Sequence, residues 1–162
     1  MDQVAAFRST ETRALPPLWE RGARIHKVLP RLVAARVAHP GNKHVLLAED
    51  EPAIRNLMQR LLDSWGYRVF SAGNGREALE IAQEHKGPIH LLVSDVNMPE
   101  MEGPELAEKL KAKRPRLRVI LVSGYSHTEI VLQRGWKFIQ KPFHLEELRA
   151  AVEDSWKPET SL

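Results

Sequence analysis

Short apolar runs alternate with helical apolar patterns from His44 to the end of the chain, and this alternation restricts the fold more than any other feature. The runs have the length of strands and lie at residues 45–48, 67–72, 89–94, 117–122 and 136–140. Between the first two runs, apolar side chains recur at the spacing of an amphipathic helix: Ile54, Leu57, Met58, Leu61 and Leu62. Strands that alternate with helices of about 10–15 residues form βαβ units. The sequence therefore predicts an α/β protein with five parallel strands and helices on both faces of the sheet.

Residues 1–43 do not continue this pattern. Prolines break any long element there, at Pro16, Pro17, Pro30 and Pro40. The segment also holds eight lysines and arginines against three acids, whereas residues 44–162 are nearly balanced. We therefore expect an N-terminal extension or linker at 1–43 that is partly disordered, a folded domain at 44–157 and a short tail at 158–162. The scattered basic residues favour a solubilising extension over an arm that binds nucleic acid or acidic lipid.

Composition excludes several classes of protein. The chain has no cysteine, so a disulfide framework and a thiolate metal site are both excluded. No apolar run approaches the roughly 20 residues that a membrane span needs. Arg8, Glu11 and Arg13 interrupt the stretch where a signal peptide would have its apolar core. We expect a cytoplasmic protein that does not associate with membranes.

Three carboxylates follow two of the predicted strands. Glu49 and Asp50 come after the first strand, and Asp95 comes after the third. Ligands of such sheets bind beyond the carboxyl ends of the strands, so these side chains should converge there. Clustered carboxylates repel one another unless a cation compensates, and oxygen ligands without histidine or cysteine suit Mg²⁺. The alternative is that Glu49 and Glu51 are solvated loop acids.

A cation and a hydroxyl group follow the remaining strands. Lys141 comes after the fifth strand and precedes Pro142, and Ser123 ends the fourth. An ammonium group at this edge can neutralise the acids and contact a phosphoryl oxygen. Either residue alone would be an ordinary surface residue, but as members of one set at successive strand ends they indicate a functional site.

Four segments of the chain resemble the signatures of response-regulator receiver domains, in the same order and at suitable spacings. They are Val45–Pro52, Leu91–Pro99, Val122–Tyr125 and Gln140–Phe143. The resemblance covers about residues 44–157. It implies a five-stranded, flavodoxin-like α/β fold and a phosphoacceptor in a two-component system or phosphorelay.

The resemblance also implies roles for individual residues. Asp95 would accept the phosphoryl group. Mg²⁺ would be held by Glu49, Asp50 and Asp95, assisted by the backbone carbonyl of Asn97. No cofactor other than Mg²⁺ is implied, and the domain would undergo self-phosphorylation without being a turnover enzyme.

Further roles follow around the fifth strand. Ser123 and Lys141 would contact the phosphoryl group, and the bond between Lys141 and Pro142 would be cis. Phe138 falls at the family's aromatic switch position, which responds together with Ser123 to phosphorylation.

The chain departs from the family's pattern in two places. Only Thr128–Leu132 has a helical pattern between Gly124 and Lys141, so the fourth helix should be short. Nothing follows the last helix, so we expect no DNA-binding output domain. The expected partner is a sensor histidine kinase or a histidine phosphotransfer protein. Residues 22–31 weakly resemble the last strand of a histidine-kinase ATPase domain, which suggests the receiver of a hybrid kinase; a single-domain receiver with an unrelated extension is the alternative.

Three other functions remain as alternatives. A phosphatase of the haloacid-dehalogenase type would also use an aspartate nucleophile with Mg²⁺, but it carries a second aspartate two residues on, where this chain has Asn97. A degenerate receiver that acts only through protein–protein contacts is disfavoured because no site position is lost. DNA binding is the third. The oligomeric state is left open.

Overall fold

The computed structural model describes residues 42–124 and 135–157, all within the compact unit Ala38–Leu162. The first half of this part contains β1 (His44–Ala48), α3 (Pro52–Ser64), β2 (Arg68–Ala72) and α4 (Gly75–Glu84). The second half contains β3 (Leu91–Asp95), α5 (Gly103–Lys113), β4 (Arg118–Ser123), β5 (Lys137–Gln140) and α7 (Leu145–Asp154). The predicted alternation of strands and helices is confirmed.

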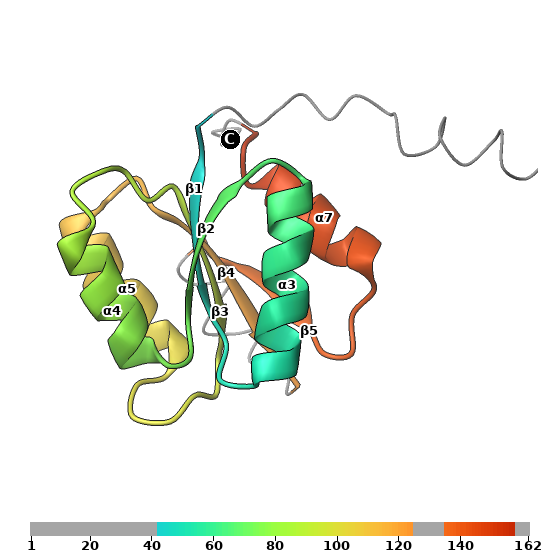
Figure 1. The fold of residues 1–162 in the computed structure, drawn as a ribbon, viewed down its shortest axis with the longest axis horizontal. Coiled ribbons are helices and arrows are strands. Elements are labelled where there is room, and N and C mark those ends of the chain that lie inside the picture. Colours follow the sequence, from blue (N-terminus) through green and yellow to red (C-terminus); the bar gives the residue numbers. More distant parts are fainter. Residues whose placement is uncertain (1–41, 125–134, 158–162) are drawn as a thin grey trace, which may run out of the picture. The chain divides into compact units, whose positions relative to one another are not determined.

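The strands form one parallel sheet in the order β2-β1-β3-β4-β5 (Figure 1). β1 is the first strand of the sheet along the chain. β2 pairs with one side of β1, and the chain then crosses to β3 on the other side. The strand order therefore reverses between β1 and β3, and a crevice opens at such a switch point at the carboxyl ends of the strands. The expected flavodoxin-like fold is confirmed.

Helices cover both faces of the sheet, with α4 and α5 on one face and α3 and α7 on the other (Figure 1). Leu46 and Leu92 of the central strands belong to the core cluster under α4 and α5, whereas Leu47 and Val93 belong to the cluster under α3 and α7. All four side chains are at most 1% exposed. Burial on both faces explains why these strands are continuous apolar runs rather than alternating ones.

The helices begin where the local sequence favours it. Asn74 caps α4 by accepting a hydrogen bond from the backbone amide of Glu77 at 2.8 Å. Prolines occupy the first turns of α3 and α5, where no helical partner exists for an amide hydrogen.

The bounds of some strands differ from the prediction by one or two residues. Tyr67 and Trp136 precede β2 and β5 instead of beginning them, although both side chains are buried. β3 extends one residue further, to Asp95, because its ladder partners continue to that point, whereas β4 ends at Ser123 as expected.

Several predictions fall outside the described residues. They include the short fourth helix at Thr128–Leu132 and nearly all of the extension at 1–43; both domain boundaries therefore stay predictions. Within the described ranges, no helix is long and apolar enough to cross a membrane.

Candidate functional site

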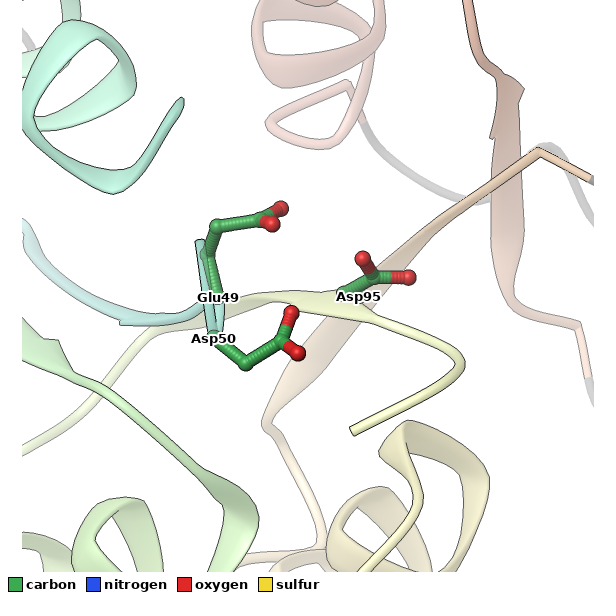
Figure 2. A group of neighbouring side chains, drawn as sticks. All are labelled: Glu49, Asp50 and Asp95. Atoms are coloured by element: carbon green, nitrogen blue, oxygen red, sulfur yellow. The ribbon is translucent and has the colours of Figure 1, made fainter. Parts of the chain in front are cut away.

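The three acids predicted for the site lie together at the carboxyl end of the sheet (Figure 2). β1 and β3 are in register with Ala48 opposite Ser94, which places Glu49 beside Asp95. One carboxylate oxygen from each of Glu49, Asp50 and Asp95 lies within 4.8 Å of the other two. Glu49 is 1% exposed and Asp95 is 9% exposed, whereas Asp50 is open to solvent. The interpretation of Glu49 as a solvated loop acid is therefore wrong.

Lys141 reaches this cluster from the end of β5. Its backbone amide donates to the carbonyl of Ser123 at 2.7 Å, which continues the β4–β5 ladder by one residue. Its Nζ atom donates to Asp95 Oδ2 at 2.6 Å and to Glu49 Oε2 at 2.9 Å. The peptide bond between Lys141 and Pro142 is cis, as expected.

The site holds more negative than positive charge. Burial by itself would lower the pKa of Lys141, but hydrogen bonds to Asp95 and Glu49 outweigh it and raise that pKa. Burial raises the pKa of the Glu49 carboxyl, and the ion pair with Lys141 only partly opposes this effect. One ammonium group therefore faces three carboxylates, and this surplus of negative charge favours a further cation.

One atom of Glu49 fits a bound cation in particular. Its Oε1 atom is buried and has no hydrogen-bond partner among the described residues. An unsatisfied buried carboxylate oxygen is costly. Mg²⁺ prefers oxygen ligands and binds through one or two carboxylates together with water and phosphate oxygens. The residues present therefore fit Mg²⁺.

Ser123 and Asn97 complete the surroundings of Asp95. The backbone amide of Asn97 donates to Asp95 Oδ1 at 3.2 Å, and the Asn97 side-chain amide approaches Ser123 Oγ at 3.5 Å. Ser123 is fully buried at the end of β4. The structure thus places the predicted hydroxyl at the same sheet edge as Asp95.

Phe138 lies on β5, opposite Leu121 of β4 and three residues before Lys141. Its side chain is partly buried against the core cluster under α4 and α5. Lys141, which contacts Asp95, directly follows the strand that carries Phe138, and the switch role of Phe138 stays a prediction.

Two residues that support the site were missed by the sequence analysis. Arg55 Nη1 donates to the backbone carbonyls of Glu49, at 2.7 Å, and Asp50, at 3.3 Å, and so fixes the loop after β1. Gly103 packs so tightly against the end of β3 that a Cβ atom there would lie 2.2 Å from the Asp95 carbonyl oxygen. Two sequence signals could have indicated these residues. Arg55 lies one turn into the helix that follows an acidic loop, and Gly103 directly precedes Pro104.

A parallel five-stranded sheet with acids at the β1–β3 switch point and a lysine from β5 defines a class of phosphoacceptor domain, and the comparisons agree. Residues 45–153 match the model of the response regulator receiver domain. The chain belongs to this family, and residues 45–153 form a receiver domain of two-component signalling.

Several related proteins are similar in sequence to this chain over its receiver domain. The sensor kinase CckA of Brucella abortus is 42% identical over 118 residues, which cover 70% of this chain but only 12% of CckA. The response regulator receiver protein CpdR of the same organism is 36% identical over 115 residues, which cover 68% of this chain and 94% of CpdR. The crystal structure of the response regulator TrrA from Thermotoga maritima with Mg²⁺ and BeF is 31% identical, with a TM-score of 0.62, and the match covers 70% of this chain and 98% of TrrA.

Proposed function

We propose that Asp95 accepts a phosphoryl group from a phosphohistidine of a sensor kinase or histidine phosphotransfer protein, beside a Mg²⁺ ion. The observation that carries the proposal is the Lys141 ammonium group, which contacts Asp95 at 2.6 Å and Glu49 at 2.9 Å within a cluster of three carboxylates. A structural ion pair would need one acid, whereas phosphoryl transfer needs a nucleophile, a cation site and a positive charge together.

In the proposed reaction, a carboxylate oxygen of Asp95 attacks the phosphorus atom. The P–N bond to the histidine breaks, and the imidazole leaves with the electron pair of that bond. Asp95 suits the role because its carboxylate is held at both oxygens, by Asn97 N at 3.2 Å and by Lys141 Nζ at 2.6 Å. An oriented carboxylate loses less entropy on reaching the geometry of attack.

Lys141 would follow the charge as the reaction proceeds. The product carries close to two negative charges on its phosphoryl oxygens. The Nζ atom already lies between Glu49 and Asp95, so a small movement exchanges a carboxylate contact for a phosphoryl contact. The Ser123 hydroxyl would then approach the same group, and Phe138 would turn into the space that Ser123 leaves. Amide hydrogen exchange with and without a beryllofluoride mimic of the phosphoryl group tests this step. Unchanged protection of the β5 amides would contradict it.

Glu49, Asp50 and Asp95, with the backbone carbonyl of Asn97, would hold the Mg²⁺ ion. When bound, the ion offsets charge on the phosphoryl group as it transfers. Glu49 supplies a buried oxygen that has no partner in the part of the chain that the structure describes, and Asp50 supplies an exposed oxygen that can bind directly or through water. The similarity to TrrA, whose structure contains Mg²⁺ and BeF, supports this assignment.

The residue two positions after Asp95 is not an acid, and this argues for storage of the phosphoryl group rather than turnover. Asn97 stands two residues after Asp95, where a haloacid-dehalogenase phosphatase uses an aspartate as its acid and base. We therefore propose a self-phosphorylating receiver rather than a turnover enzyme. Its partner belongs to the kinases and phosphotransfer proteins that carry phosphohistidine. Because such kinases use cytoplasmic ATP, we propose a cytoplasmic location.

The similarity to CckA, described as a hybrid histidine kinase, supports a receiver that acts with a hybrid kinase or derives from one. The match across most of CpdR supports a single-domain receiver equally well. A phosphotransfer screen against purified kinases and phosphotransfer proteins would distinguish the two origins. A hybrid origin predicts that the receiver accepts phosphate from one phosphotransfer protein in preference to sensor kinases.

The proposal is tested by incubating the protein with acetyl phosphate and Mg²⁺ and measuring its intact mass. The wild type should gain one phosphoryl group, and Asp95→Asn should gain none. Asp63→Asn, at an exposed aspartate of α3, is the matched control and should behave as the wild type. Full phosphorylation of Asp95→Asn would refute the assignment.

A further inference from the structure

The end of the sheet opposite the carboxylates carries clustered positive charge. Lys43 directly precedes β1, and Arg68, Arg118 and Lys137 are the first residues of β2, β4 and β5. Because all the strands are parallel, these four cations share the amino edge of the sheet, while the acids of the phosphoacceptor site share the carboxyl edge.

A hollow of about 570 Å³ opens at this edge, between the starts of β4 and β5 and the end of α7. We call it the basal hollow. Its lining includes five basic residues and one acidic residue: Lys111, Arg116, Arg118, Lys137, Lys157 and Asp154. Its volume lies in the range of small-molecule sites, about 300–1,000 Å³.

Asp154, the one acid among the described residues of the lining, cannot neutralise the basal hollow. Asp154 Oδ1 lies 2.5 Å from Lys157 Nζ and is engaged in that ion pair. Burial and the neighbouring Lys157 lower the pKa of Lys137, although Asp154 acts in the opposite direction. Burial and Arg118 likewise lower the pKa of Lys43, next to the basal hollow. Burial is the main cause of both lowered pKa values, and the neighbouring cations add to it.

Two of the cations are held in place before any ligand arrives. The Arg118 guanidinium lies 5.3 Å from the centre of the Trp156 ring, and Lys43 Nζ lies 3.8 Å from it, so both interact with its π face. Trp156 is itself fixed, because its indole nitrogen donates to the Tyr67 hydroxyl at 2.8 Å. A cation held in this way loses little side-chain entropy when it binds an anion.

We propose that the basal hollow binds a polyphosphate group, as carried by a nucleoside diphosphate or found free as pyrophosphate. Arginine forks match phosphate oxygens in pairs, and Arg116 and Arg118 lie two residues apart beside Lys137. Several cations around one confined hollow suit several linked phosphates better than one carboxylate.

The test is calorimetric titration of the full chain with ADP and with pyrophosphate, at low salt and with EDTA. EDTA removes Mg²⁺, so binding at the acidic site does not contribute. Both ligands should bind with a Kd below about 1 mM. Arg118→Gln/Lys137→Gln should weaken binding at least about tenfold, which is about 1.4 kcal/mol. Arg116→Gln, at another exposed position of the lining, should also weaken binding. This single variant covers the case that the double variant folds poorly.

The matched control is Arg60→Gln/Lys109→Gln, which removes the same charges from exposed positions on α3 and α5 outside the basal hollow. It should bind as the wild type does. ADP binding tighter than pyrophosphate would support a nucleotide, and equal binding would support recognition of the phosphates alone. Absence of saturable binding, equal weakening in the control, or tighter binding of a single-stranded oligonucleotide than of ADP would overturn the proposal.

Discussion

Lys141 Nζ lies 2.6 Å from Asp95 Oδ2, although 46 residues separate the two in the chain. The same nitrogen lies 2.9 Å from Glu49 Oε2, across 92 residues. These contacts join residues at the ends of β1, β3 and β5. The proposed phosphoacceptor site therefore also contains an ion-pair network that connects three strand ends at the carboxyl edge of the sheet.

Removal of the Lys141 charge should destabilise the domain. In Lys141→Met, the Glu49 carboxylate stays buried without its partner, which costs about 3 kcal/mol of unfolding free energy. Urea unfolding at pH 7.5 in EDTA measures the loss. Lys141→Met/Glu49→Gln should recover at least half of it, because the buried charge is gone. A double variant no more stable than the single one would contradict this account of the network.

Mg²⁺ affinity should depend more on Asp50 than on Glu49. Asp50 is exposed and has no ion pair among the described residues, whereas Glu49 already shares its charge with Lys141. Asp50→Ala should lower the affinity at least about tenfold, and Glu49→Ala should lower it less. Calorimetric titration with MgCl₂ measures both. Equal affinity in the two variants and the wild type would exclude these residues as the metal site.

Gly103 should tolerate no side chain. A Cβ atom at this position would lie 2.2 Å from the Asp95 carbonyl oxygen and 2.9 Å from Ser94 Oγ, so the end of β3 must shift. Gly103→Ala should cost about 1–3 kcal/mol of unfolding free energy and slow phosphorylation of Asp95. Gly124→Ala is the control, because no described atom lies within 4 Å of its added Cβ. Equal stability of the two variants would show that the loop after β3 adapts.

Stability should fall as the pH drops below about 6.5, in part through His90. Burial, and then the charges of His44 and Lys43, lower the pKa of His90 below its ordinary 6.5. The unfolded chain then takes up a proton first, so stability is present above 6.5 and is lost as the pH falls from there toward the lowered pKa. Protonation also competes with the hydrogen bond from the His44 amide to His90 Nδ1 at 2.9 Å.

His90→Asn retains an acceptor at this position but cannot titrate. Its unfolding free energy should change less than that of the wild type between pH 7.5 and 5.5 in urea titrations. An identical pH dependence in the two proteins would assign the effect to other groups.

Much of the site could be predicted because a residue at the end of a strand has a defined place in the sheet. In a parallel sheet, residues that end a buried strand or directly follow it lie at one edge. Sequence position alone therefore predicted that Glu49, Asp95, Ser123 and Lys141 lie together. The strand bounds were less certain, because a buried aromatic residue such as Tyr67 continues an apolar run without joining the ladder.

The partners of the side chains could not be predicted in the same way. Whether Lys141 pairs with Glu49 or with Asp50 depends on the direction in which each side chain leaves the loop, and spacing does not encode this direction. The contacts of Arg55 with two backbone carbonyls depend on how α3 is placed against β1. The basal hollow combines residues of α5, β4, β5 and α7, and only the assembled sheet brings them together.

The most direct test of the central claim is the location of the phosphoryl group itself. The protein is treated with acetyl phosphate and Mg²⁺ and then reduced with borohydride, which converts an aspartyl phosphate to homoserine. Peptide mass spectrometry then locates the homoserine. Our account predicts homoserine at position 95 alone, and only when Mg²⁺ is present. Homoserine at position 50, or at any aspartate other than Asp95, would contradict it.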